Sequence, residues 1–185
     1  MDGHVLVLGG ARSGKTGFAE RLAMRSGERP LYLATAQALD AEMVERVRLH
    51  RQQRHKRFST LEEPIALATA LKAAAKTHDV ILVDCLTLWI SNLLGANRNV
   101  AQAVDELIAT LRQASSARVI LVSNEVGLGI VPDNAMARTF RDLAGAAHQR
   151  LAEICAEVHF VVAGLPMTLK GPRLTESTTE LPRPE

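Results

Sequence analysis

Residues 4–16 read HVLVLGGARSGKT, and this stretch decides the fold. Its apolar run at 5–8 predicts a buried strand, and residues 9–16 then have the P-loop spacing G-x-x-x-x-G-K-[ST]. The glycines let backbone N–H groups cradle phosphate oxygens, while Lys15 would reach the β- and γ-phosphates. The Thr16 hydroxyl would ligate Mg²⁺, and the dipole of the helix expected next would favour an anion. The stretch therefore predicts a nucleoside-triphosphate site with Mg²⁺.

The rest of the chain alternates strand and helix patterns. Uniformly apolar strand patterns are separated by stretches in which apolar residues have helical spacing. Such strands are buried on both faces, as in parallel sheets. We therefore expect an α/β fold of the P-loop NTPase type, with a mainly parallel central sheet flanked by helices. After residues 5–8, the expected strands are 31–36, 79–84, 118–123 and 158–162, and the expected helices are 17–23, 40–54, 62–75, 86–94, 100–114 and 133–156.

Length and composition indicate one domain. A chain of 185 residues can bury a sizeable core, and we assign residues 1–170 to a single P-loop α/β domain. Residues 171–185 contain three prolines and almost no apolar pattern, so we expect a mobile tail. Asp40 and Asp133 are expected to cap helices, and Glu62-Glu63-Pro64 is expected to begin one.

Composition also excludes several kinds of partner. With 47% hydrophobic residues and a net charge of +2, the chain has the composition of a soluble globular protein. Aromatic residues at 3% argue against stacking platforms for nucleic acid, and the apolar stretch 80–94 is too short and too polar to span a membrane. Cys85 and Cys155 are isolated, as expected for core residues in a reducing compartment. We expect a cytoplasmic protein without nucleic-acid partner or membrane insertion.

Two further stretches could carry chemistry beside the P-loop. Asp84 ends an apolar strand pattern, where P-loop proteins place the acid that holds Mg²⁺ through water. Alternatively, Asp84 caps the following helix. The turn 123–132, SNEVGLGIVP, follows another strand at the same predicted sheet edge, and it is either a loop over the ligand or a structural connection. The chain lacks an N-K-x-D sequence, so the guanine-reading signature of switch GTPases is missing.

The basic segment 46–57 contains two histidines, His50 and His55. A solvated helix face is the ordinary interpretation of such a charge run, and nucleic-acid contact is the usual second one. On a helix, Arg46 and Arg54 would lie one turn to either side of His50. Two flanking guanidiniums disfavour an imidazolium, so His50 could remain a neutral nucleophile while the arginines hold phosphates. Geometry alone favours a surface histidine.

Taken together, four stretches resemble one family. They read LVLGGARSGKT, LYLATAQALDAEMVERVRLHRQQR, LVDCLTLWISNLL and SNEVGLGIVPDNAMARTFRDLAGAAHQRLAE. The resemblance extends over about residues 5–170 and is to the bifunctional adenosylcobinamide kinase / adenosylcobinamide-phosphate guanylyltransferases of cobalamin synthesis. The last two stretches are far more specific than the P-loop.

The resemblance implies two reactions in sequence. ATP or GTP phosphorylates adenosylcobinamide, and GMP is then transferred from GTP to adenosylcobinamide-phosphate through a histidine, which the motif places at His50. The resemblance also implies a homotrimer, Lys15 as a second catalytic residue, and Thr16 and Asp84 as metal-holding residues. It assigns nucleotide contacts to Gly9, Gly10, Ala11, Arg12, Ser13, Gly14, Lys15, Thr16, Ala34, Thr35, Ala36, Arg51, Gln52, Gln53, Arg54, Glu62 and Asp84.

Three residues depart from the family pattern. His55 stands where proline is usual, Phe58 where tryptophan is usual, and His148 where asparagine is usual. The first two affect the exit from the nucleophile helix. Two rival functions stay open from the sequence: a P-loop kinase of another small alcohol with His50 idle, and a nucleotide-gated interaction or nucleic-acid module using the basic helix. Substrate screening and salt dependence of binding would separate them.

Overall fold

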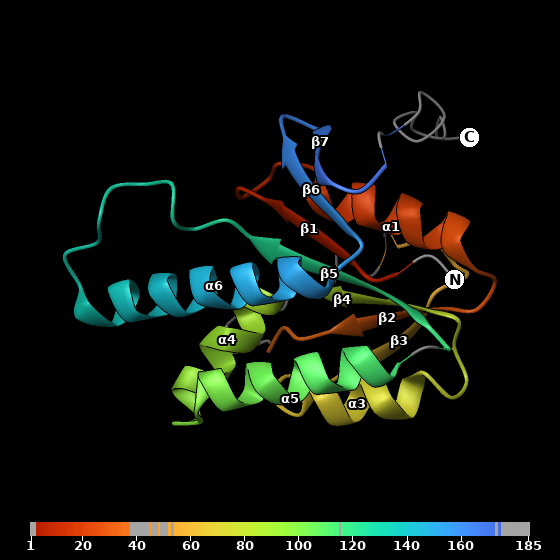
Figure 1. Cartoon of the computed structure of the whole chain (residues 1–185), viewed down its shortest axis with the longest axis horizontal. Helices are drawn as coiled ribbons and strands as arrows, with labels where there is room; N and C mark the ends of the chain where they lie inside the picture. Colours follow the sequence, from red (N-terminus) through yellow and green to blue (C-terminus); the bar gives the residue numbers. More distant parts are fainter. Residues whose placement is uncertain are drawn as a thin grey trace.

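The computed structural model describes residues 3–37, 45, 48, 52, 54–114, 116–172 and 174. In this part of the chain the strands form one seven-stranded sheet in the order β3-β2-β4-β5-β1-β6-β7 (Figure 1). All neighbouring strands are parallel except β7, which is antiparallel to β6. The expected α/β fold with a mainly parallel sheet is confirmed. The strands are β1 Val5–Gly9, β2 Pro30–Ala34, β3 Ser59–Glu62, β4 Val80–Asp84, β5 Arg118–Asn124, β6 Glu157–Val162 and β7 Leu165–Lys170.

Helices cover both faces of the sheet (Figure 1). Because side chains alternate along a strand, Val5 and Val7 of β1 join the core beneath α1, whereas Leu6 and Leu8 join the larger core beneath the other helices. Apolar residues at every position of the central strands supply both cores, which explains their continuous apolar runs. The helices are α1 Lys15–Ser26, α3 Leu67–Ala74, α4 Leu86–Gly95, α5 Val100–Gln113 and α6 Ala135–Ile154.

Strand β1 lies between two strands that come much later in the chain. Val5 pairs with Ile120 of β5 on one side and with Glu157 of β6 on the other. Since β1, β4 and β5 are parallel, their carboxyl ends meet at one edge of the sheet, where ligands bind in open α/β folds. The P-loop, Asp84 and the turn after β5 are thereby brought together.

Two expected helix starts are wrong. Glu62 ends β3, where it pairs with Ala34 of β2, and helix α3 begins only at Leu67. The carboxylate of Glu63 accepts the backbone N–H groups of Ile65 and Ala66, so Glu63 belongs to the turn between β3 and α3. The side chain of Asn134, not Asp133, caps α6 by accepting two backbone N–H bonds. Both adjacent residues are good caps, and the sequence did not discriminate between them.

The structure adds two strands to the expected set, and both lie at the sheet's edges. β3 is exposed along its whole length, and β7 contains a proline, so neither has the apolar run of a central strand. Four residues of the helix expected at 40–54 are described. Glu45, Arg48 and Gln52 are helical, and Arg54 is not. The rest of this helix, including its expected cap Asp40, is outside the described residues.

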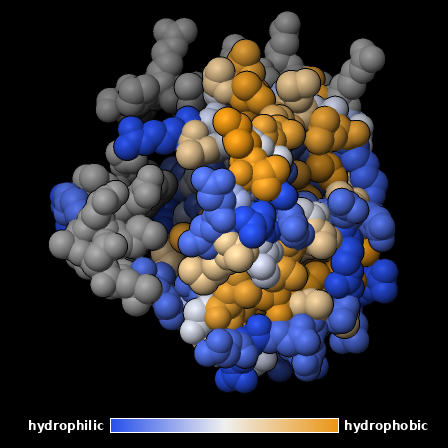
Figure 2. Space-filling model, turned by 90° about the vertical axis from the view of Figure 1, so that its left-hand side faces the viewer, coloured by the Kyte–Doolittle hydropathy of each residue, from blue (hydrophilic) through white to orange (hydrophobic). Residues whose placement is uncertain are grey.

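Exposed apolar side chains lie mainly on the turn after β5 and on β7, with Leu61 on β3 at the opposite edge of the sheet. Among the described residues, they include Ile130 at 97% exposure on the turn after β5 and a row on β7. Figure 2 shows apolar areas on one side of the molecule, interrupted by hydrophilic side chains. The other exposed apolar residues are Leu128, Val131, Met136, Val162, Leu165, Met167 and Leu169.

Cys85 and Cys155 are free and buried, which confirms them as core residues. No helix in the described part of the chain is long and apolar enough to cross a bilayer.

Candidate active site

The phosphate loop depends on two glycines. A Cβ on Gly9 would lie 2.5 Å from the carbonyl oxygen of Val161 and 2.6 Å from Oγ of Ser13, so any side chain would displace the loop from the neighbouring strand. Gly14 has a φ of 90°, which side chains disfavour. It is the N-cap of α1 and makes no side-chain hydrogen bond to the first turn. A helix N-terminus capped in this way leaves backbone N–H groups to attract an anion such as phosphate.

Lys15 is the first residue of α1, and only 8% of it is exposed. Its ammonium donates to the carbonyl oxygen of Gly10 at 3.0 Å, so it lies across the loop that would surround the phosphates. Burial lowers the pKa of Lys15, and the negative charge of Asp84 opposes that shift. A buried cation without a fixed carboxylate partner is suited to an anionic ligand.

Asp84 ends β4 and faces the start of α1. Its Oδ2 accepts hydrogen bonds from the hydroxyl of Thr16 at 3.1 Å and from the hydroxyl of Tyr32 at 2.6 Å. The two residues expected to hold Mg²⁺ are therefore in direct contact. Asp84 does not cap the next helix, because α4 has Cys85 as its N-cap and no side-chain cap bond.

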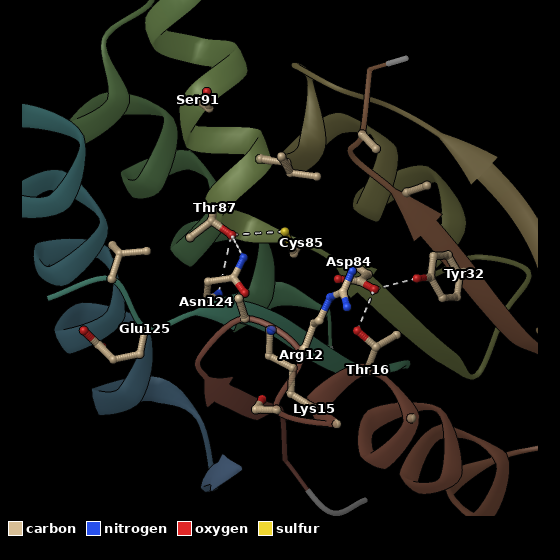
Figure 3. Close-up of a pocket in the computed structure, with 18 of the residues that line it drawn as sticks. Arg12, Lys15, Thr16, Tyr32, Asp84, Cys85, Thr87, Ser91, Asn124 and Glu125 are labelled. Carbon is tan, nitrogen blue, oxygen red and sulfur yellow. Dashed lines mark hydrogen bonds between the residues drawn. The ribbon is translucent and has the colours of Figure 1, made fainter. Parts of the chain in front are cut away.

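A cleft of about 850 Å³ joins these groups (Figure 3). Figure 3 shows Thr16 and Tyr32 both directed at Asp84, with Thr87 and Asn124 bonded to each other beside them. Asn124 at the end of β5 and the first two residues of the turn after it, Glu125 and Val126, also line the cleft. Of the residues expected to contact nucleotide, the cleft is lined by Ala11, Arg12, Ser13, Gly14, Lys15, Thr16, Ala34, Ala36, Arg54, Glu62 and Asp84.

The other expected residues do not line the cleft or lie outside the described residues. Gly9 and Gly10 form the backbone at the base of the loop. Thr35 is fully buried, and its hydroxyl donates to the Cys85 carbonyl and accepts from the Cys85 N–H. Gln52 is helical and exposed. His50, Arg51 and Gln53 are outside the described residues.

Comparison with known proteins identifies the family. Residues 5–169 match the profile of the family described as cobinamide kinase / cobinamide phosphate guanyltransferase. The chain belongs to this family. It is 49% identical over 175 residues to the bifunctional adenosylcobalamin biosynthesis protein CobP of Pseudomonas aeruginosa, covering 90% of this chain and 96% of that one. It is 40% identical over 180 residues to CobU of Escherichia coli and 42% identical over 182 residues to CobU of Salmonella typhimurium, covering 90% of this chain and 99% of each relative.

Solved structures with similar backbones are much more distant in sequence. A KaiC-like protein from Pyrococcus horikoshii is 12% identical, with a TM-score of 0.48 over 85% of this chain and 70% of that one.

Within this family member, Tyr32 is the cleft residue that sequence reasoning missed most clearly. The chain has one tyrosine, which lies two residues before Ala34 on β2 and so shares its face of the sheet. That spacing was the available signal, because Ala34 was already expected in the site. The other cleft residues that were not expected are Gly17, Cys85, Thr87, Leu88, Ser91 and Phe140.

Glu20 adds a second carboxyl group close to Asp84. It follows Thr16 by one turn on α1, and its pKa is raised to about 7. Burial is the main cause, while the guanidinium of Arg54 lowers the pKa and the charge of Asp84 raises it. Arg54 therefore lies in the field of two acidic groups, which favours its position at this side of the cleft.

The turn after β5 divides into two parts. Glu125 lines the cleft, and its Oε1 accepts from the backbone N–H of Gly127. His148 of α6 lies behind it, with Nδ1 3.7 Å from Glu125 Oε2 and Nε2 2.7 Å from the Ser123 hydroxyl. Burial lowers the pKa of His148, so a neutral ring can replace the asparagine usual in the family. Beyond residue 127 the turn extends away from the body of the molecule (Figure 1).

Proposed function

We propose that this protein catalyses two successive steps of cobalamin synthesis. In the first, ATP or GTP phosphorylates the aminopropanol hydroxyl of adenosylcobinamide. In the second, GMP is transferred from GTP to adenosylcobinamide-phosphate, which yields adenosylcobinamide-GDP and pyrophosphate. The observation that carries the proposal is the family match along residues 5–169. The cleft that joins the phosphate loop, Asp84 and Arg54 supports it.

The phosphate loop would position the triphosphate for the first step. Its backbone N–H groups and the start of α1 would hold the β-phosphate, and the ammonium of Lys15 would move from Gly10 to the β- and γ-phosphates. The corrinoid hydroxyl would attack the γ-phosphorus, and the nucleoside diphosphate would leave. Such transfer depends on positioning and charge neutralisation, which these groups supply.

Thr16 and Asp84 fit the Mg²⁺ that accompanies a nucleoside triphosphate. They present a hydroxyl and a carboxylate oxygen 3.1 Å apart inside the cleft, which is the hard-oxygen donor set that Mg²⁺ prefers. Among the described residues there is no group of three or more His, Cys, Asp and Glu side chains that could enclose a metal. Two protein oxygens together with phosphate oxygens and water match the usual binding of Mg²⁺, which neutralises phosphate charge when bound.

The second step would proceed through His50. An imidazole nitrogen would attack the α-phosphorus of GTP and release pyrophosphate, and an oxygen of the corrinoid phosphate would then displace the histidine from the phosphorus. One difficult displacement is thereby divided into two easier ones. Arg54, whose guanidinium lines the cleft, is placed to neutralise phosphate charge during both displacements.

Product masses test the proposed function directly. Protein incubated with adenosylcobinamide, Mg²⁺ and GTP should convert the corrinoid first to a species with one added phosphate and then to one with GMP added to that phosphate. ATP in place of GTP should give at most the first product, because it contains no guanylyl group. Absence of both products from well-folded protein contradicts the proposal, and phosphorylation of a different alcohol instead would favour the rival kinase.

We also propose a cytoplasmic homotrimer. The exposed apolar side chains on β7 and on the turn after β5 support subunit contact, because large exposed apolar areas often mark interaction sites. The free, buried cysteines support a reducing compartment. Sedimentation equilibrium should give three times the 20.1 kDa chain mass, and a monomer at micromolar concentration would contradict the trimer.

A further inference from the structure

Tyr32 makes two polar contacts that core packing does not require. It is 3% exposed, and its ring packs edge-on against Phe58 with centroids 5.9 Å apart at 89°. A phenylalanine would satisfy this packing equally well. The Tyr32 hydroxyl nevertheless lies 2.6 Å from Oδ2 of Asp84. The guanidinium carbon Cζ of Arg54 lies 3.3 Å from the centroid of the Tyr32 ring. One side chain therefore contacts two groups of the proposed site.

The hydroxyl restrains the carboxylate that is proposed to face Mg²⁺. Tyr32 and Thr16 both donate to Oδ2 of Asp84, and two donors on one oxygen restrict the rotation of the carboxylate. The Tyr32 hydroxyl is the donor in this contact, at 2.6 Å from Oδ2. β2 and β4 are adjacent parallel strands with Tyr32 opposite Leu82, which keeps the two side chains in reach of each other.

The ring restrains Arg54. The planar guanidinium stacks on the aromatic face, where the ring quadrupole attracts a cation, and its Nη1 donates to the hydroxyl of Thr60 at 2.8 Å. Both contacts are made to neighbouring strands, since Thr60 pairs with Tyr32 across β2 and β3. The guanidinium is therefore held in one plane at the cleft wall.

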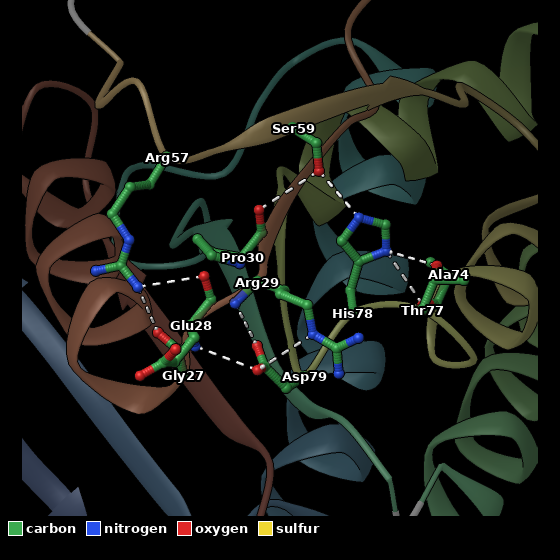
Figure 4. Close-up of polar contacts among 10 residues, drawn as sticks. All are labelled: Gly27, Glu28, Arg29, Pro30, Arg57, Ser59, Ala74, Thr77, His78 and Asp79. Carbon is green, nitrogen blue, oxygen red and sulfur yellow. Dashed lines mark hydrogen bonds and ion pairs between the residues drawn. The ribbon is translucent and has the colours of Figure 1, made fainter.

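The chain immediately after Arg54 is anchored as well (Figure 4). The side chain of Arg57 donates to the carbonyl oxygens of Gly27 and Glu28 at 3.0 and 3.3 Å, and Ser59 contacts His78 through its hydroxyl. Phe58 is buried between these contacts. Arg54 lies three residues before Arg57, so the stretch that contains it is held against both the loop before β2 and the strand itself.

We propose that Tyr32 is a positioning residue that holds both the carboxylate of Asp84 and the guanidinium of Arg54 in place at the cleft. The proposal rests on the proposed function for the reactions involved. The effects of the two contacts of Tyr32 can be separated by comparing two substitutions. Tyr32→Phe deletes the hydroxyl and keeps the ring, whereas Tyr32→Leu deletes both. As a control, Phe58→Leu removes the buried ring that packs edge-on against Tyr32.

The first measurement is equilibrium binding of a fluorescent, non-hydrolysable GTP analogue with and without Mg²⁺. Tyr32→Phe should reduce the gain in affinity that Mg²⁺ provides by about five-fold, the effect of one hydrogen bond, and leave Mg²⁺-free binding unchanged. Phe58→Leu should lower the melting temperature without changing the Mg²⁺ dependence. An unchanged Mg²⁺ dependence in folded Tyr32→Phe protein overturns the hydroxyl contact as a positioning device.

The second measurement is the rate at which label from α-labelled GTP is transferred to the protein. Tyr32→Leu should label about ten-fold more slowly than Tyr32→Phe, and Arg54→Lys, which keeps the charge but loses the planar stack, should reproduce this difference. Equal labelling of the two Tyr32 variants overturns the ring contact. If the unaltered protein neither labels nor forms product, the proposed function fails, whereas the Mg²⁺-binding comparison still decides the hydroxyl contact.

Discussion

Protein in which His50 is replaced by alanine should acquire no label from α-labelled GTP and should make no adenosylcobinamide-GDP. The expected intermediate is a phosphoramidate, because an imidazole nitrogen would bond to the α-phosphorus when pyrophosphate leaves. A phosphoramidate is labile in acid and comparatively stable in base. Label on the unaltered protein should therefore persist in alkali and be released by mild acid.

The first reaction provides the internal control for His50→Ala. Phosphorylation of adenosylcobinamide need not pass through the histidine, so it should at least partly persist in the variant. His55→Ala is the matched substitution, because His55 is exposed in the same basic segment and its Nδ1 accepts only from the backbone N–H of Arg57 among the bonds described. Full labelling of His50→Ala together with loss of labelling in His55→Ala would show that the nucleophile is His55, and the assignment to His50 would be wrong.

Lys15→Ala should lower kcat/KM of both reactions by about a hundred-fold or more while the protein stays folded. Lys15 is the buried cation of the phosphate loop, and its loss would leave the charge of the β- and γ-phosphates poorly compensated. Stability should not fall, because an ammonium whose burial already lowers its pKa is being removed from the interior.

Steady-state rates for both reactions, with thermal unfolding beside them, measure this effect. Lys72→Ala is the matched control, since Lys72 is exposed on α3 and distant in the chain from the phosphate loop. It should change neither rate. Normal turnover in Lys15→Ala would show that the loop is not the working phosphate site.

The sequence predicted the centre of the fold better than its edges. Strands β1, β4 and β5 are apolar at successive positions because each faces two cores, and this pattern is visible without coordinates. β3 has no such pattern. It is exposed along its whole length and is paired only with β2, so its existence depends on contacts from distant parts of the chain.

The site divides in the same way. Lys15 and Thr16 belong to a local motif, and Asp84 was found because strand ends converge in parallel sheets. The role of Tyr32 could not be predicted, because its contacts join residues from three separate parts of the chain. Thr35 shows the opposite case: it is adjacent in sequence to two cleft residues, yet it is buried with its hydroxyl bonded to the backbone of Cys85.

The position of β1 between β5 and β6 has a consequence for how the molecule is made. The phosphate-loop strand is synthesised before both of its sheet neighbours, which lie much further along the chain. Closing such long chain segments costs entropy before any pairing compensates for it, and folds rich in distant pairings form slowly. Gly9 acquires its close approach to Val161 only when β6 has docked. The triphosphate can therefore stabilise the chain by mass action only late in folding, after the sheet around it has closed.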